Sequence, residues 1–207
     1  LEYDGYWFND QRKGQGKSYK DGKIDYEGEW LNGQQTGQGK LYRDGKLEYE
    51  GGWLDGETTG QGTSYRDGKL WYEGESLHSQ RHGQGKLYRT NGEIEYDGEW
   101  LNCKRNGQGK MYSTNGKLWY EGEWFNGKST GQGKMYNDDK IVYDGEWLDG
   151  QRNGHGKFYL YGKLLHDGAW LYGKQTGYGK MYRTNGELLY EGEWLNGRLN
   201  GQGKGYY

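Results

Sequence analysis

Apolar and polar positions alternate along the chain in short stretches that are separated by turn sequences. In residues 46–54, one set of alternate positions carries Leu47, Tyr49, Gly51 and Trp53, and the other carries Glu48, Glu50, Gly52 and Leu54. A period of two predicts a β-strand with two different faces. The dipeptide Asp55-Gly56 follows, and such pairs are typical of two-residue hairpin turns, in which both central residues have positive φ. The pattern therefore predicts a β-hairpin.

This hairpin pattern repeats along the whole chain. The signature Tyr-[Glu/Asp]-Gly, with His166 once in place of tyrosine, recurs at intervals of 23 or 24 residues; its copies begin at residues 3, 26, 49, 72, 96, 120, 143, 166 and 190. The extra residue of the longer copies lies in a turn such as Thr90-Asn91-Gly92, as expected when the strands keep their register and the turn is exposed. We predict an all-β fold: an elongated single-layer antiparallel meander of nine stacked hairpin repeats over residues 1–207. At about 4.8 Å per strand it would extend over roughly 85 Å.

Glycines occupy fixed positions within each repeat. One follows the signature aromatic residue by two positions, and a Gly-x-Gly pair, such as Gly60 and Gly62, follows later. Glycine weakens a strand, so its recurrence needs a reason. We expect the rings of Tyr49 and Trp53 to lie over the Gly-x-Gly backbone of a neighbouring strand, which only glycine leaves open to a ring.

The repeated sequence resembles that of a known protein family. Residues 120–128, which read Tyr-Glu-Gly-Glu-Trp-Phe-Asn-Gly-Lys, are followed by Gly131-Gln132-Gly133-Lys134, and this phrase is similar to the MORN (membrane occupation and recognition nexus) repeat. The resemblance covers essentially the whole chain. It implies a rod-like sheet of hairpins and a role in binding or scaffolding, either between proteins or at membranes. Departures such as Ser76 for tryptophan, His166 for tyrosine and Cys103 for a turn glycine put local packing in doubt, but not the fold.

Composition narrows the function further. The formal net charge is −2, with 28 Lys and Arg against 30 Asp and Glu. The sequence lacks the basic patch that is typical of nucleic-acid-binding proteins. The four histidines share no spacing typical of metal ligands, and Gly-x-Gly without a third glycine and a following helix is a weak nucleotide motif. We therefore expect no cofactor, no metal site and no catalytic residues.

The second face of the predicted sheet is charged. A glutamate row that includes Glu29 lies on the first strand of the repeats, and a lysine row that includes Lys40 lies on the second. Opposite charges across strands stabilise a sheet. In the third repeat both residues are absent together, as Gly52 and Thr63, which suggests that the two rows pair.

One part of this charged face departs from the others. His155 and Tyr178 replace the usual glutamine, and Ala169 replaces glutamate, while Tyr161 and Tyr172 lie in the flanking turns. Aromatic residues are enriched where proteins bind one another. We take these five residues as a candidate partner-binding patch, with ordinary drift between repeats as the alternative interpretation.

These features favour a non-catalytic repeat scaffold that binds a protein or peptide partner in the cytoplasm. A tether at the periphery of a membrane, which binds phospholipid, is one alternative, and the repeat domain of a larger enzyme is another. The array also has no polar cap at either end. We therefore expect either that the chain is part of a longer protein or that it associates with itself end to end.

Overall fold

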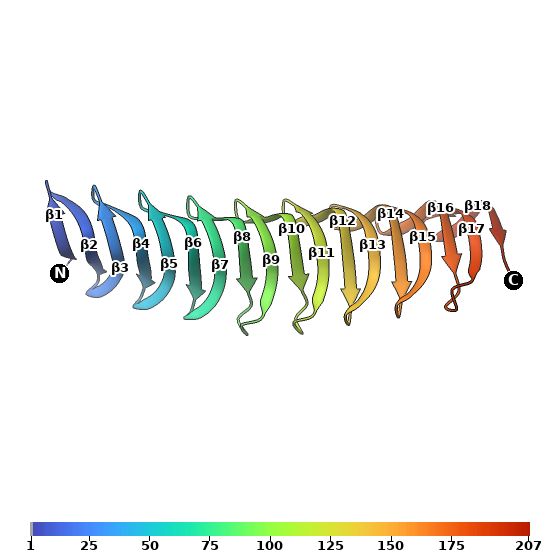
Figure 1. The fold of residues 1–207 in the computed structure, drawn as a ribbon, viewed down its shortest axis with the longest axis horizontal. Coiled ribbons are helices and arrows are strands. Elements are labelled where there is room, and N and C mark those ends of the chain that lie inside the picture. Colours follow the sequence, from blue (N-terminus) through green and yellow to red (C-terminus); the bar gives the residue numbers. More distant parts are fainter. Residues whose placement is uncertain (1) are drawn as a thin grey trace. The chain divides into compact units, whose positions relative to one another are not determined.

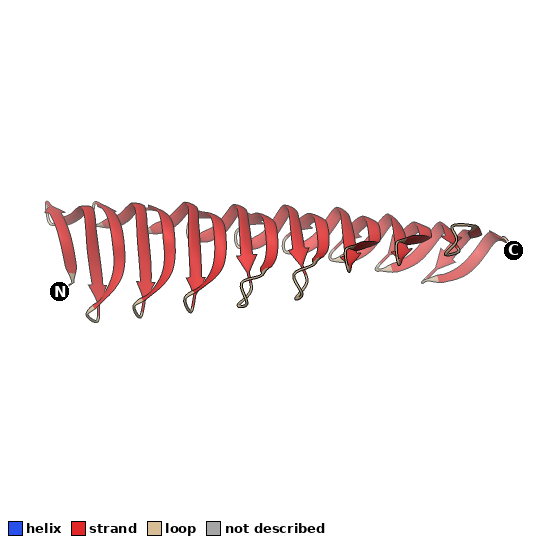
Figure 2. Cartoon of the chain, turned by 60° about the horizontal axis from the view of Figure 1, so that its bottom comes forward, coloured by secondary structure: helices blue, strands red, loops and turns tan. Residues whose placement is uncertain are grey.

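The computed structural model describes residues 2–207, and it divides the chain into two compact units, residues 1–104 and residues 105–207. Within the described range every regular element is a strand, eighteen in all. Figure 2 shows these strands in red, joined by tan turns. Each strand is antiparallel to the next within its unit. The predicted all-β meander of hairpin repeats is confirmed.

Unit 1 contains nine strands in sequence order (Figure 1). They are β1 (Tyr3–Phe8), β2 (Gln11–Lys20), β3 (Lys23–Leu31), β4 (Gln34–Arg43), β5 (Lys46–Leu54), β6 (Glu57–Arg66), β7 (Lys69–Leu77), β8 (Gln80–Tyr88) and β9 (Ile94–Leu101). The odd-numbered strand carries the signature of each repeat, and the following even-numbered strand carries its Gly-x-Gly pair.

Unit 2 repeats this arrangement. Its strands, the first of which begins with the last residue of unit 1, are β10 (Lys104–Tyr112), β11 (Leu118–Phe125), β12 (Lys128–Asn137), β13 (Lys140–Leu148), β14 (Gln151–Leu160), β15 (Lys163–Leu171), β16 (Lys174–Tyr182), β17 (Leu188–Leu195) and β18 (Arg198–Gly205).

The turns have the geometry that their sequences predict. Asp55 and Gly56 have φ values of 50° and 80°, so both central residues lie in the left-handed region that two-residue hairpins require. Residues other than glycine occupy the second turn position as well: Cys103 has a φ of 64°. A side chain there is strained, because Cβ crowds the backbone in this region.

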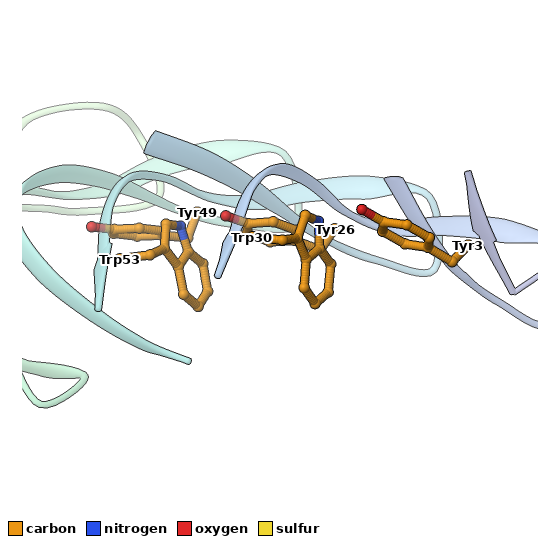
Figure 3. Close-up of a cluster of buried hydrophobic side chains, with 5 residues drawn as sticks. All are labelled: Tyr3, Tyr26, Trp30, Tyr49 and Trp53. Carbon is orange, nitrogen blue, oxygen red and sulfur yellow. The ribbon is translucent and has the colours of Figure 1, made fainter. Parts of the chain in front are cut away.

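The core of each unit is a row of aromatic rings instead of an aliphatic interior. Its members come from two positions of the repeat, which we call the tyrosine row and the tryptophan row. Figure 3 shows members of both rows in unit 1, the rings of Tyr3, Tyr26, Trp30, Tyr49 and Trp53. Neighbouring rings meet edge to face, with centroids 5.1–5.5 Å apart, the arrangement that aromatic quadrupoles favour.

Ring packing on glycine is confirmed, and each ring has its own contact. A Cβ added to Gly39 would overlap the ring of Tyr26, and one added to Gly62 would overlap that of Tyr49. The indole Nε1 of Trp53 donates a hydrogen bond of 3.2 Å to the carbonyl oxygen of Gly39. The second glycine of each pair is therefore the surface on which the rings rest.

The first glycine of each Gly-x-Gly pair has a different structural role, which the alternation of apolar and polar residues does not predict. Gly37 has a φ of 58°, and the equivalent glycines of all nine repeats lie between 53° and 72°. The register shifts at this point, because Gly28 pairs with Gly39 while Glu29 pairs with Thr36. The first glycine thus forms a β-bulge that needs a left-handed residue.

The register of the strands determines which carboxylates the lysine row contacts. Lys40 lies 3.5 Å from Glu50 and Lys17 lies 2.9 Å from Glu27, so the lysine row pairs with the acidic residue of the Tyr-[Glu/Asp]-Gly signature. Glu29 instead accepts a hydrogen bond of 3.0 Å from the backbone amide of Gln38, within the bulge. The expected pairing of Glu29 with Lys40 is wrong, because the strand register places Lys40 opposite Glu27 on one side and Glu50 on the other.

Candidate binding surfaces

Three residues of the predicted patch lie on adjacent strands of unit 2. His155 on β14 is directly opposite Ala169 on β15. On β16, Ala169 is opposite Thr176, and Tyr178 lies in the β-bulge between Thr176 and Gly179, on the far side of β15 from His155. Tyr178 is 59% exposed, and the Nε2 atom of His155 lies 3.2 Å from a carboxylate oxygen of Asp167. The result is an aromatic residue and a histidine around a methyl group on a surface that is otherwise charged.

The backbone at Tyr178 lacks a stabilising carboxylate that several other repeats supply. Glu146 accepts a hydrogen bond of 3.0 Å from the amide of His155, and Glu123 accepts one of 2.9 Å from the amide of Gln132. At the equivalent position of the eighth repeat, Ala169 has no carboxylate to accept a bond from the Tyr178 amide. The same substitution thus removes a charge from the surface and a restraint from the bulge.

Tyr161 and Tyr172 lie farther from this group. Both occupy the first position of two-residue turns, with φ values of 50° and 49°, and both are strongly exposed. Tyr161 precedes β15 and Tyr172 follows it, so the two tyrosines mark opposite ends of a nine-residue strand. The structure brings His155, Ala169 and Tyr178 together, and it places Tyr161 and Tyr172 at the two rims.

His166, the histidine of the tyrosine row, is part of the core. Its ring is 2% exposed and meets the indoles of Trp170 and Trp194 edge to face, at 5.3 and 4.9 Å. Neither ring nitrogen has a hydrogen-bond partner within the described residues. Burial lowers the pKa of His166 to about 4, although Asp167 opposes the shift, so the ring is neutral near pH 7.

Unit 1 holds a second candidate surface, which lies on the face of the rings. A hollow of about 890 Å³ opens there, and we call it the Ser76 hollow. Its lining includes Tyr49, Trp53, Trp71, Tyr72, Ser76 and Arg81. Ser76, which stands where the other repeats have a tryptophan, is the sequence feature that marks this hollow. The sequence alone predicts only a local change of packing there.

The opposite face of unit 1 carries a polar groove of about 650 Å³. Its lining includes Gln38 and the carboxylates of Glu27, Glu50 and Glu73. Glu50 is close to Lys40, Glu27 is close to Lys17, and Glu73 accepts a 3.0 Å hydrogen bond from the hydroxyl of Tyr88. Each of these carboxylates therefore contacts its own neighbouring lysine or tyrosine on the sheet, and the three do not converge on one point.

Two further features bear on the kind of site that the chain could hold. Over residues 2–207, three or more His, Cys, Asp or Glu side chains do not come together in a way that would hold a metal ion. In the same range the structure has no helix of the length and hydrophobicity needed to cross a membrane.

The fold and these surfaces define a class: a tandem array of β-hairpins with an aromatic core that presents its faces to solvent. A family model of the MORN repeat matches the chain nine times, at residues 3–24, 26–46, 49–69, 72–94, 96–117, 120–140, 143–161, 166–187 and 190–204. The chain belongs to the MORN repeat family. A search of curated proteins found no match. Repeats of this family typically take part in interactions with proteins or membranes, and they are generally not catalytic.

Proposed function

We propose that this chain is a non-catalytic scaffold that binds a partner protein or peptide, with His155, Ala169 and Tyr178 at the centre of the contact. The observation that carries the proposal is the exposure of Tyr178, which is 59% accessible beside a position where a methyl group replaces the usual carboxylate. Tyr161 and Tyr172 contribute at the rims of the same surface.

The chemistry of this surface suits a protein contact. A tyrosine buries a large area with little loss of side-chain entropy and keeps a hydroxyl for hydrogen bonding. The centres of protein interfaces are depleted in charge, because an unpaired charge is costly to desolvate. The replacement of glutamate by Ala169 removes one such cost, and His155 is already close to Asp167.

A membrane tether is the alternative that the family brings with it. The lysines of the charged face are close to carboxylates, and the net charge is −2, whereas an anionic lipid surface attracts unpaired clusters of Lys and Arg. We therefore place the chain in the cytoplasm as a protein-binding array, and a phospholipid surface and a larger enzyme are the other settings to be tested.

The test replaces the patch with residues that the other repeats carry. A triple variant, His155→Gln, Ala169→Glu and Tyr178→Gln, keeps the strand pattern while it removes the patch. Affinity capture followed by mass spectrometry should recover a protein with the wild-type chain and lose it with the triple variant. Phe125→Ala, which removes an exposed ring elsewhere in unit 2, is the control and should retain the protein.

Two further arms separate the alternatives. The double variant Tyr161→Asp and Tyr172→Asn converts both turns to common hairpin residues, so a loss of capture there would assign the rims to the contact. Sedimentation with anionic liposomes tests the lipid alternative. Equal capture by the wild-type chain and the triple variant would contradict a protein-binding patch at these residues. Sedimentation with the liposomes that the triple variant abolishes would assign the patch to lipid instead.

A further inference from the structure

Unit 1 contains one place where the ring core is interrupted. Within its tryptophan row, residue 76 is serine, whereas the preceding and following repeats have Trp53 and Trp100. Trp53 covers Tyr26 of the preceding repeat and Tyr49 of its own repeat, at 5.2 and 5.4 Å. Ser76 has no ring to cover Tyr49 and Tyr72 in the same way.

The other repeats define what the missing side chain contributes. Trp30 donates from Nε1 to the carbonyl oxygen of Gly16, Trp53 donates to Gly39 and Trp100 donates to Gly85, at 3.3, 3.2 and 3.0 Å. The equivalent carbonyl in the interrupted repeat is that of Gly62, which follows Gly39 by one repeat. This position therefore has the walls of an indole seat and its hydrogen-bond acceptor, but no indole.

The space at this position is open. The Ser76 hollow is lined by Tyr49 and Tyr72, the two rings between which an indole would lie, and by Ser76 itself. Arg81 borders it, with its guanidinium 4.3 Å from the ring of Trp100, 4.9 Å from that of Trp71 and 5.8 Å from that of Tyr72. Guanidinium groups over indole rings are held by cation–π attraction, so this wall is preorganised.

We propose that the Ser76 hollow binds the side chain of a tryptophan from a partner protein, which completes the interrupted ring row. The inserted indole would meet Tyr49 and Tyr72 edge to face and donate its N–H to the carbonyl of Gly62. Removal of a large buried side chain elsewhere leaves a cavity that accepts a small aromatic molecule of matching shape, and here the sequence itself has made that removal. The inference deepens the binding role proposed above by naming an inserted residue, but the hollow lies in unit 1 and the patch lies in unit 2.

Indole is the probe that tests this. By NMR titration of the full chain, the amide resonances of Gly62, Ser76 and Arg81 should shift and saturate, with a Kd of about 1 mM, as expected for nine heavy atoms at modest efficiency. 1-Methylindole cannot donate a hydrogen bond and should bind about fivefold more weakly, the factor that one neutral hydrogen bond contributes. Shifts that do not saturate, or that map to other residues, would overturn the proposal.

Ser76→Trp is the matched variant, because it restores the side chain that the other repeats carry. It should raise the melting temperature and reduce indole binding at least tenfold. Unchanged indole affinity in a folded Ser76→Trp variant would place the ligand elsewhere and overturn the assignment. The NMR map of the wild-type chain stands by itself if the variant packs differently. Because the probe is a small molecule, this test can fail or succeed independently of partner capture at the patch.

A final arm links the seat to a peptide. N-acetyltryptophanamide should compete with indole for the same resonances, whereas N-acetylleucinamide should be at least tenfold weaker, since it offers neither a ring edge nor an N–H at the position of the indole nitrogen. Equal binding of the two amides would overturn the selectivity for tryptophan.

Discussion

Acid should destabilise unit 2 through a single buried side chain, His166. The ring lies between the indoles of Trp170 and Trp194, and burial lowers its pKa from 6.5 to about 4. A pKa that is lower in the folded state means that the unfolded chain binds the proton more tightly. Stability is therefore full above pH 6.5 and is lost as the pH falls from 6.5 toward 4.

The size of this effect follows from the shift. Each pKa unit corresponds to 1.36 kcal/mol, so a shift of about 2.5 units makes His166 cost about 3 kcal/mol of unfolding free energy at or below pH 4. Asp167 limits the shift and His155 increases it. Many carboxylates titrate in the same range, so the total pH dependence is not by itself diagnostic.

The variant His166→Tyr isolates the histidine, because it restores the residue that the other repeats carry. At pH 7 the variant should be at least as stable as the wild-type chain, since a tyrosine hydroxyl here could donate to the carbonyl of Ala169, as Tyr143 donates to that of Glu146 at 3.0 Å. Between pH 7 and pH 4 the stability difference between the two proteins, measured by urea unfolding, should grow by about 3 kcal/mol.

A direct titration gives the refuting result. The ring protons of His166, followed by NMR, should report a pKa near 4. A pKa near 6.5, or a stability difference between the two proteins that stays constant with pH, would show that the ring is hydrated or paired in solution.

Three further predictions concern the repeat itself. Gly39→Ala should cost about 3 kcal/mol or more, because the new Cβ overlaps a tyrosine ring, whereas Gly205→Ala, with open space around it, should stay within about 0.5 kcal/mol; thermal or urea unfolding checks both. Glu123→Gln should cost roughly 1 kcal/mol by weakening the bond to a bulge amide, and equal stability would show that this bond is exchanged for water. Cys103→Gly should gain roughly 1 kcal/mol by removing a side chain at a φ of 64°, and a loss of stability would mean that the turn is not strained.

The sequence predicted the parts of this fold that depend on period. Rings of the tyrosine and tryptophan rows were expected to lie on Gly-x-Gly because both recur in one register, and Tyr26 over Gly39 has that geometry. The turn conformations followed for the same reason, since Asp55-Gly56 restricts φ at both positions.

The pairing of the charged residues could not be predicted from the sequence, because the strand register and the bulge determine it. Simple alternation places Glu29 and Lys40 on one face, but the register sets Lys40 opposite Glu27, and two extra residues, Gly37 and Gln38, form a bulge opposite Glu29. The carboxylate of Glu29 accepts a hydrogen bond from a backbone amide of that bulge. A bulge is a property of paired strands, and one strand's pattern does not reveal it. The hollow beside Ser76 was missed for a related reason, because a substitution reveals a lost ring but not whether neighbouring side chains close the gap.

Substitutions at the two candidate surfaces differ in how much they disturb the packing of the core. On the charged face, Tyr178 and His155 replace glutamine without touching a ring, so a changed surface there leaves the core intact. In the ring rows a member such as Trp53 contacts a ring on each side, so a departure disturbs the packing. His166 preserves a ring and keeps both of its indole contacts, whereas Ser76 keeps none. The array can therefore vary the glutamine positions of its charged face without disturbing the ring core. Ser76, where a hydroxymethyl group replaces a buried ring in unit 1, is the place where an external ring could restore stability on binding.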